Sequence, residues 1–262
     1  MKLFFRKYGE GQPLIILHGV LGVSDNWVTI GRRLAQKFTV FIPDQRNHGQ
    51  SPHSDTLNYY VLADDLIEFM EDHQIRNPVL IGHSMGGKVA MKIALEYPQR
   101  ISKLVVIDIS PRRYPSRQEH IEIIQAMKEV NFDQVSSREE VDKIIAGKIR
   151  SEKIRLFILK NLYRIGRKRF GWRLNIEGIY RNIDAVAEPI DTAFKFDKPC
   201  LFIRGENSGY VRDEDIEPIV QLFPHAIVET IQDASHWLHA EKPDELCAIL
   251  SNFLEKTCEY SV

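Results

Sequence analysis

The sequence predicts an α/β fold, with a mostly parallel sheet flanked by helices and a helical cap inserted into it. Short apolar runs alternate with segments of helical spacing from residue 14 to residue 109, and again from residue 199 onward. Between these regions only helical patterns are expected. A chain of 262 residues has room for one large α/β domain with such an insertion. We therefore expect residues 1–111 and 188–262 to form the core, and residues 112–187 to form a cap, or lid.

Strands and helices alternate before the expected cap. The strands are short apolar runs of the kind that is buried on both faces of a parallel sheet. The helices place apolar residues on one face, such as Ile30, Leu34 and Phe38 in the first. In chain order we expect a strand at 14–17, a helix at 27–38, a strand at 40–42, a helix at 59–73, a strand from Pro78, a helix at 88–97 and a strand at 104–109.

The expected cap contains helices and no strand. Residues 120–130 and 151–162 have helical spacing, in the second case through Ile154, Phe157, Ile158 and Leu162. After the cap we expect strands at 199–203 and 227–231, a helix around 213–222 and a last helix at 244–256.

A serine stands between two glycines directly after the third expected strand. Residues 82–86 read Gly-His-Ser-Met-Gly, which matches the Gly-x-Ser-x-Gly nucleophile elbow. In this turn a strained backbone lifts the serine hydroxyl into the open, and side chains two positions before or after it would collide. The strand before the motif and the helix after it strengthen the interpretation. We predict that Ser84 is a nucleophile.

A serine hydroxyl needs a base to take its proton, and we expect that base to be His236. His236 follows the last expected strand, where a parallel sheet places its functional loops. His239, three residues later, is the alternative. His83 lies inside the elbow, points elsewhere, and is expected to pack or hydrogen-bond locally.

The base needs a carboxylate to orient it, and this sequence has no acidic residue at the position where that carboxylate usually stands. In α/β folds with such an elbow, the acid commonly stands after the strand that here spans 199–203, three residues after a glycine. Counting from Gly205, that position is Ser208, which cannot serve. Asp108, at the end of the strand after the elbow, is the predicted substitute. Glu206 and Asp213 remain alternatives.

Attack on a carbonyl creates an oxyanion that needs two N–H donors. We expect one from Met85, at the start of the helix after the nucleophile, and the other from Val20 in the loop after the first strand. His18 is expected to hold that loop. A second polar loop, residues 43–52, is expected to brace the floor of the site rather than to act through Asp44, Arg46 or His48.

Composition narrows the class of protein. A net charge of −1 argues against nucleic acid as the main partner, and no apolar run is long enough to cross a bilayer. The first residues do not resemble a secretory signal, so a cytoplasmic location is expected. The three cysteines, Cys200, Cys247 and Cys258, are too scattered for a disulfide framework or a metal site. We expect no cofactor and no metal.

Positive charge is concentrated in one segment of the expected cap. Residues 148–173 contain one acid, Glu152. This asymmetry suggests an anionic substrate such as an acyl-CoA, a solvated basic face, or a docking surface for acidic lipid or protein. The ten basic residues are Lys148, Arg150, Lys153, Arg155, Lys160, Arg164, Arg167, Lys168, Arg169 and Arg173.

These motifs resemble the α/β-hydrolases, and in particular the YbfF-type bacterial esterases and their mitochondrial abhydrolase relatives. The resemblance rests on residues 44–52, on Gly82-His-Ser-Met-Gly-Gly-Lys, on residues 105–111 and on Ser235-His-Trp. It implies a Ser-Asp-His triad whose acid follows the strand after the elbow, which supports Asp108. It also implies a helical lid over a cleft that accepts carboxylic esters, in some relatives acyl-CoA thioesters. Gln45 departs from the family, in which leucine is usual.

The leading hypothesis is a serine carboxylesterase without a cofactor, acting on small-molecule esters through an acyl-enzyme on Ser84. Perhydrolase or C–C bond hydrolase activity is the enzymatic alternative, because the same triad serves both. A ligand sensor that turns over slowly is the alternative from another class.

Overall fold

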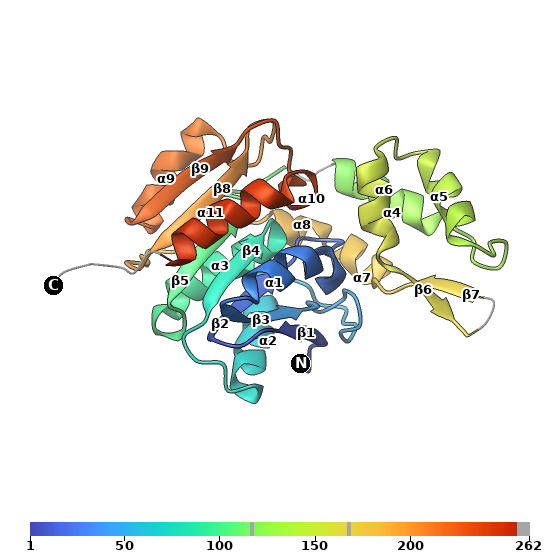
Figure 1. Ribbon diagram of the computed structural model, residues 1–262. Helices are drawn as coiled ribbons and strands as arrows, with labels where there is room; N and C mark the ends of the chain where they lie inside the picture. The colour runs from blue at the N-terminus through green and yellow to red at the C-terminus, as the bar shows by residue number, and fades with distance from the viewer. Residues whose placement is uncertain (116–117, 167–168, 256–262) are drawn as a thin grey trace.

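A seven-stranded sheet forms the centre of the protein (Figure 1). The computed structural model describes residues 1–115, 118–166 and 169–255. The strands lie in the order β1-β3-β2-β4-β5-β8-β9, and all neighbours are parallel except β1 and β3. They are β1 (Phe5–Tyr8), β2 (Gln12–Leu17), β3 (Phe38–Pro43), β4 (Val79–His83), β5 (Lys103–Ile107), β8 (Cys200–Gly205) and β9 (Ala226–Ile231).

Helices cover both faces of this sheet, which is why its central strands are continuously apolar. Leu14 and Ile16 of β2 point to one face and share a cluster with helices α1 (Val28–Leu34) and α11 (Pro243–Glu255). Ile15 and Leu17 point to the other face. There they join a larger cluster with helices α2 (Tyr59–Asp72), α3 (Met85–Glu96) and α9 (Ile216–Leu222).

The inserted segment lies beside the sheet, at the end where the parallel strands finish (Figure 1). It contains helices and one hairpin, and its apolar side chains join the larger cluster of the core. In chain order its elements are α4 (Gln118–Lys128), α5 (Arg138–Ala146), α6 (Glu152–Leu159), β6 (Leu162–Ile165), β7 (Arg169–Trp172), α7 (Ile176–Arg181) and α8 (Ile183–Ala187).

The hairpin corrects the expectation that residues 112–187 contain no strand. Strands β6 and β7 pair antiparallel, with Leu162 opposite Trp172 and Ile165 opposite Arg169. Each strand has only four residues, and basic side chains interrupt its apolar ones, so the period of two is too short to stand out. The end of the expected helix at 151–162 is therefore strand, and α6 stops at Leu159.

Other boundaries move for local reasons. The helix expected at 27–38 ends at Leu34, because the chain turns there and Phe38 begins β3. Phe38 still packs in the same cluster as Ile30 and Leu34, which explains its misleading spacing. The edge strand β1 was not expected at all. The last helix is described to Glu255, and Lys256 lies outside the described residues.

None of the helices in the described part of the chain combines the length and apolar character needed to cross a membrane.

Candidate active site

Ser84 lies at a sharp turn between β4 and α3. Its φ of 52° and ψ of −119° form a conformation that residues other than glycine rarely adopt, as expected of a nucleophile elbow. A β-carbon on Gly82 would lie 2.2 Å from the carbonyl oxygen of Gly86, and one on Gly86 would lie 2.5 Å from that of Leu17. Glycine is therefore required at both positions, because backbone atoms occupy the space of a side chain.

Asp108 and His236 meet at the same end of the sheet. The Nδ1–H of His236 donates to a carboxylate oxygen of Asp108 at 2.7 Å, which leaves Nε2 as the proton acceptor of the ring. Asp108 is fully buried and directly follows β5, with a φ of 51°. Its other carboxylate oxygen accepts the N–H of Gly205 at 3.0 Å. The carboxylate is thus held by the end of β8 and bonded to the imidazole.

The Ser208 hydroxyl donates a hydrogen bond to Asp108. Ser208 occupies the position at which the acid was first sought, after β8. The loop after β8 therefore still contributes to the acid, as a donor rather than as the carboxylate itself. Charge-assisted hydrogen bonds of this kind favour the ionised form of a carboxyl group.

The alternative residues lie elsewhere. The Glu206 side chain accepts the N–H of Asp233 at 3.0 Å, and Asp213 pairs with Arg204 at 2.7 Å on the surface. His239 stacks on Trp27, with ring centroids 4.7 Å apart and planes 11° apart. His83 hydrogen-bonds the backbone carbonyl of His236 through Nε2 at 2.9 Å, so it holds the histidine loop.

The loop after β2 brings Val20 next to the elbow. A β-carbon on Gly19 would lie 3.1 Å from the β-carbon of Ser84, so this loop approaches the serine closely. Met85 is the first residue of α3, where helical N–H groups lack partners within the helix. Among the described residues, the N–H groups of Val20 and Met85 have no hydrogen-bond partner. Both are free to donate to a ligand.

Neutral histidines and Gln45 hold this loop in place. His18 donates through Nδ1 to the Gly19 carbonyl at 2.8 Å, and its Nε2 accepts the Gln45 N–H at 3.0 Å. The Gln45 side chain donates to the His18 carbonyl at 2.7 Å, a contact that the leucine usual in the family could not make. His48 accepts the N–H of Leu21 at 3.2 Å. Gln45 is therefore a bracing residue.

Burial lowers the pKa of four histidines around this edge. The pKa is about 4 for His18 and about 3 for His48 and His83, and it lies well below the ordinary value for His239. Desolvation is the main cause in every case, because a buried imidazolium loses its hydration. These side chains therefore remain neutral near pH 7.

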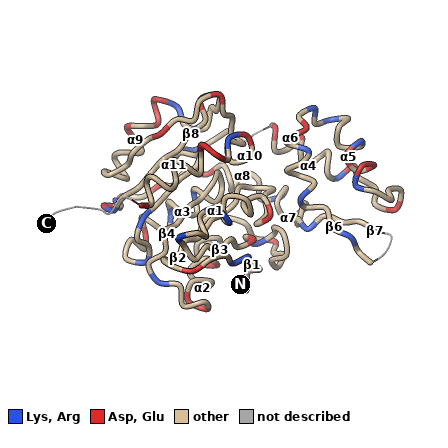
Figure 2. Tube along the Cα trace, in the orientation of Figure 1, with Lys and Arg blue, Asp and Glu red and all other residues tan. Residues whose placement is uncertain are grey.

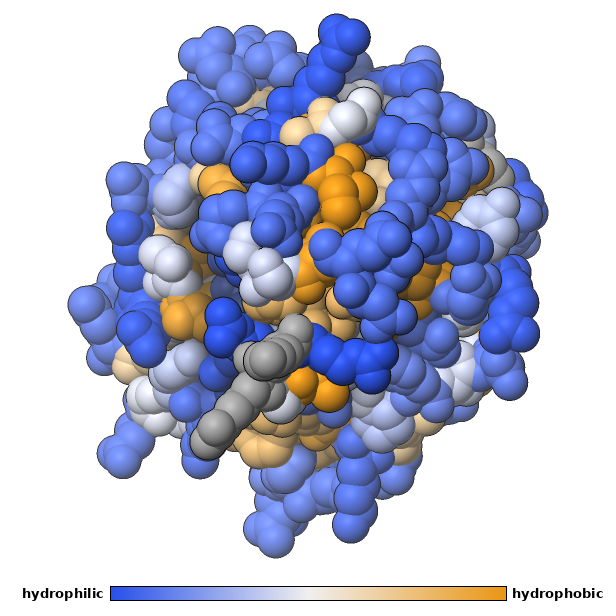
Figure 3. Space-filling view, turned by 90° about the vertical axis from the view of Figure 1, so that its right-hand side faces the viewer, coloured by the Kyte–Doolittle hydropathy of each residue, from blue (hydrophilic) through white to orange (hydrophobic). Residues whose placement is uncertain are grey.

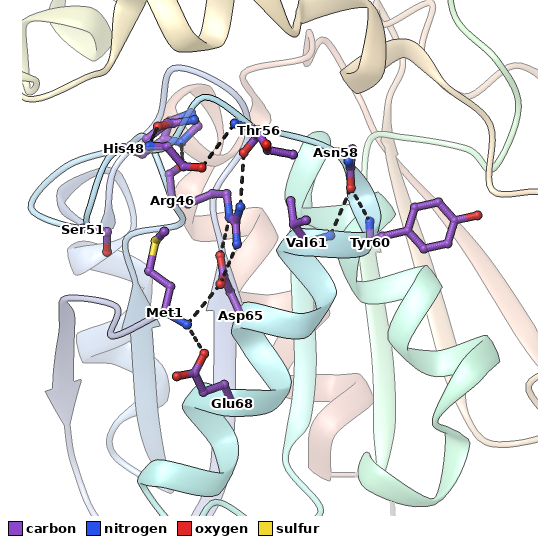
Figure 4. A network of polar contacts seen from close by, with 12 residues as sticks. Met1, Arg46, His48, Ser51, Thr56, Asn58, Tyr60, Val61, Asp65 and Glu68 are labelled. Carbon is purple, nitrogen blue, oxygen red and sulfur yellow. Dashed lines mark hydrogen bonds and ion pairs between the residues drawn. The ribbon is translucent and has the colours of Figure 1, made fainter.

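The polar side chains of residues 43–52 bond within the loop and to neighbouring parts of the core. Asp44 accepts the N–H of Ser24 at 2.6 Å and that of Gln50 at 2.9 Å. The Arg46 guanidinium forms a two-point pair with Asp65 of α2, with one contact of 2.8 Å (Figure 4). The side chains of this loop thus fix the loop itself to the core.

The cap contributes a contact to the loop that carries Val20. The Asn161 side-chain amide, fully buried, donates to the Leu21 carbonyl at 2.9 Å. Nothing in the sequence distinguished this asparagine from other polar residues of the cap. Tyr210 was also missed, although its ring stacks on His236 with centroids 3.6 Å apart.

Two cavities open at this edge of the sheet. The first, which we call the Ser84 pocket, has a volume of about 30 Å³ and is lined by Ser84, Met85, Tyr59 and apolar residues of the cap. The second, the His236 groove, has a volume of about 260 Å³ and includes His236, Lys153 and polar loop residues. Tyr210 lines both.

Acidic residues from outside the segment offset much of the positive charge of residues 148–173. The cap carries acidic and basic residues side by side, and its outer face is mostly hydrophilic with small apolar patches (Figures 2 and 3). Arg167 and Lys168 lie outside the described residues. The ion pairs are Lys148–Glu129, Lys153–Glu241, Arg155–Asp142 and Arg169–Asp133.

Cys200 and Cys247 are buried, and burial raises the pKa of the Cys200 thiol to about 12. Cys258 lies outside the described residues. Within the described ranges, no group of three or more His, Cys, Asp or Glu side chains is arranged to hold a metal ion.

Comparison with known proteins identifies the family. A family model for the alpha/beta hydrolase fold matches residues 12–142. The chain is 37% identical over 253 residues to the sn-1-specific diacylglycerol lipase ABHD11 of Danio rerio, covering 94% of this chain and 80% of that protein. It is 34% identical over 247 residues to the esterase YbfF of Escherichia coli strain K12, covering 94% of each.

The solved structures agree. A marine microorganism esterase superposes with a TM-score of 0.92 at 40% identity, covering 96% of this chain and 99% of that one. The predicted fold class and the resemblance to YbfF-type esterases are thereby confirmed. The chain belongs to the α/β-hydrolase family, as a hydrolase of the esterase and lipase type.

Proposed function

We propose that this protein is a serine carboxylesterase that cleaves small to medium acyl esters through an acyl-enzyme on Ser84. The observation that carries the proposal is the 2.7 Å hydrogen bond between His236 Nδ1 and the buried Asp108 carboxylate, at the edge of the sheet where the elbow places Ser84 in the wall of the Ser84 pocket. That bond fixes the tautomer in which Nε2 can accept a proton from the serine hydroxyl.

The reaction follows from this arrangement. The Ser84 oxygen attacks the acyl carbon while His236 takes its proton, and Asp108 stabilises the resulting imidazolium. The Val20 and Met85 N–H groups receive the oxyanion, and each such donor is worth about 2.7 to 4 kcal/mol in the barrier. The carbon–oxygen bond to the alcohol breaks as His236 returns the proton to it. Water, activated by His236, then releases the acid and restores Ser84.

Ester substrates fit the cleft better than acyl-CoA. An acyl-CoA would present phosphates to the cap, yet several cations there already pair with acids. Lys153 is the cation that lines the His236 groove, and its pair with Glu241 is long, at 3.9 Å. If acyl-CoA hydrolysis occurs and does not fall as salt rises, electrostatic capture by the cap is excluded.

The same proposal divides the chain into a core of residues 1–111 and 188–262 and a cap of residues 112–187. The two segments that connect the core with the cap lie side by side. The backbone N–H of Tyr114 donates to the Ala187 carbonyl at 2.9 Å, and the backbone N–H of Ile190 donates to the Pro111 carbonyl at 2.8 Å. Lys88 of α3, fully buried, donates its ammonium group to the carbonyls of Arg112 and Glu188. Both connecting segments are thus tied to the helix that follows Ser84.

The test is a hydrolysis panel run with the wild type and with Ser84→Ala. We expect the wild type to hydrolyse p-nitrophenyl acetate and butyrate, and the variant to retain the fold by circular dichroism and lose turnover by about 10⁴-fold or more. A folded Ser84→Ala protein with unimpaired hydrolysis would exclude the mechanism.

A further inference from the structure

A third cavity, beside the Ser84 pocket, is also lined by Tyr59. It has a volume of about 330 Å³ and is lined by residues of α2, α3 and the segment that leaves the cap, among them Tyr60, Lys92 and Ala185. We call it the outer cleft. Among the described residues, Tyr59 is the one that lines both the outer cleft and the Ser84 pocket. Tyr59 therefore lies between the two spaces.

Tyr59 is a rigid partition. Its side chain is buried, and its hydroxyl donates to the Val186 carbonyl of the cap at 2.5 Å. Burial raises the pKa of Tyr59 well above its ordinary value, so the hydroxyl keeps its proton. The backbone is fixed as well, because Asn58 caps α2 by accepting the N–H groups of Tyr60 and Val61 at 3.0 Å each (Figure 4).

The acyl group belongs in the Ser84 pocket if the proposed function holds. His236 must return its proton to the leaving oxygen, so the alcohol part of the ester lies toward His236, in the His236 groove. The acyl chain then lies in the Ser84 pocket, beside Ser84 and Met85. The walls of this pocket are mostly apolar.

The Ser84 pocket accepts little of such a chain. Its volume of about 30 Å³ is far below the roughly 300 to 1,000 Å³ of pockets that enclose drug-sized ligands. The outer cleft reaches the lower end of that range. We propose that Tyr59 sets the limit on acyl chain length, by closing the Ser84 pocket after a few carbons and keeping longer chains out of the outer cleft. This inference rests on the serine esterase mechanism proposed above.

The test compares kcat/KM for p-nitrophenyl acetate, butyrate and octanoate. The wild type should prefer the two short esters. Replacing Tyr59→Ala joins the two cavities, and each additional buried methylene is worth about fourfold in binding. We therefore expect the octanoate-to-butyrate ratio of kcat/KM to rise at least about tenfold in Tyr59→Ala. An unchanged ratio in a folded variant that still hydrolyses acetate would overturn the inference.

Matched variants separate the partition from other effects. Tyr60→Ala removes the neighbouring aromatic ring from the outer cleft alone, so its chain-length profile should match the wild type. Tyr59→Phe removes the hydrogen bond to Val186 and keeps the ring, and it should also keep the profile. Filling the outer cleft with Ala185→Trp in the Tyr59→Ala background should reverse the gain.

A second substitution covers the case in which Tyr59→Ala does not fold. The leucine side chain in Tyr59→Leu still fills the apolar space next to the core but is shorter than tyrosine. This variant should raise the octanoate-to-butyrate ratio of kcat/KM about threefold or more. No rise in this variant would contradict the inference. Failure of the proposed function is distinguishable, because it would appear as hydrolysis of acetate that survives Ser84→Ala, whatever the chain-length profile.

Discussion

The two sides of the cleft are stabilised differently. On the core side, Asp108, His18 and His48 are almost fully buried, and each forms hydrogen bonds with backbone groups. On the cap side, apolar side chains such as Leu156 and Ile165 are about half exposed, and the charged residues meet in surface pairs. Surface pairs contribute about 0 to 1 kcal/mol each, whereas a buried network is rigid. The residues proposed to carry out the chemistry thus belong to the preorganised core, and the cap contributes walls of the Ser84 pocket.

The largest effect expected on the core side follows replacement of the acid. Asp108→Asn should lower kcat by about 10⁴-fold, as in serine proteases, because the amide favours the wrong histidine tautomer. Glu206→Gln is the matched control, since its side chain binds the Asp233 amide in a turn. Comparable losses in both variants would refute the assignment of Asp108.

Acid should destabilise the core through its buried histidines. In the folded protein the pKa values of His18, His48 and His83 are about 3 to 4, below the ordinary value of 6.5, so the unfolded chain binds protons first as the pH falls. The stability that these neutral histidines contribute is therefore fully present above pH 6.5 and is lost progressively as the pH falls to 3 to 4. Between pH 7 and pH 5.5 the three should together cost about 4 kcal/mol of unfolding free energy.

Urea denaturation at several pH values measures this loss. A free energy of unfolding that stays constant from pH 7 to pH 5.5 would show that the histidines are not buried neutral groups of the core.

A smaller effect should come from the contact that Asn161 of the cap makes with the loop that carries Val20. Asn161→Ala leaves the buried Leu21 carbonyl without its donor, which costs about 1 to 3 kcal/mol in unfolding free energy. We expect kcat to fall as well, by about tenfold, because the loop positions an oxyanion donor. Asn182→Ala is the control, since its side chain bonds the carbonyls of Asp55 and Gly178 and not the loop that carries Val20. Equal kcat values for both variants would show that the cap does not support the chemistry.

The core could be predicted from the sequence because burial on both faces leaves a simple pattern. The runs that became β2, β4 and β5 are continuously apolar, and the turn after β4 requires glycine at two fixed positions. Because a serine at position 208 cannot act as the acid, the sequence favoured Asp108 instead. The Asp108 carboxylate accepts a hydrogen bond from that serine. At these positions backbone contacts allow only certain residue types, so the residue types alone predict the local geometry.

The cap and the supporting residues could not be predicted in the same way. Strands β6 and β7 are too short for their alternation to be recognised among basic residues. Asn161 and Tyr210 act through contacts with residues far away in the chain, Leu21 and His236. Such long-range contacts leave no local period in the sequence. The edge strand β1 is likewise defined by its pairing with β3.

Covalent labelling of Ser84 tests the central claim most directly. The wild type, incubated with a fluorophosphonate probe, should gain the mass of one adduct, and peptide mapping should place it on Ser84. The Ser84→Ala protein should gain none. Labelling of Ser84→Ala at the wild-type rate, or an adduct that maps to another residue, would contradict the account.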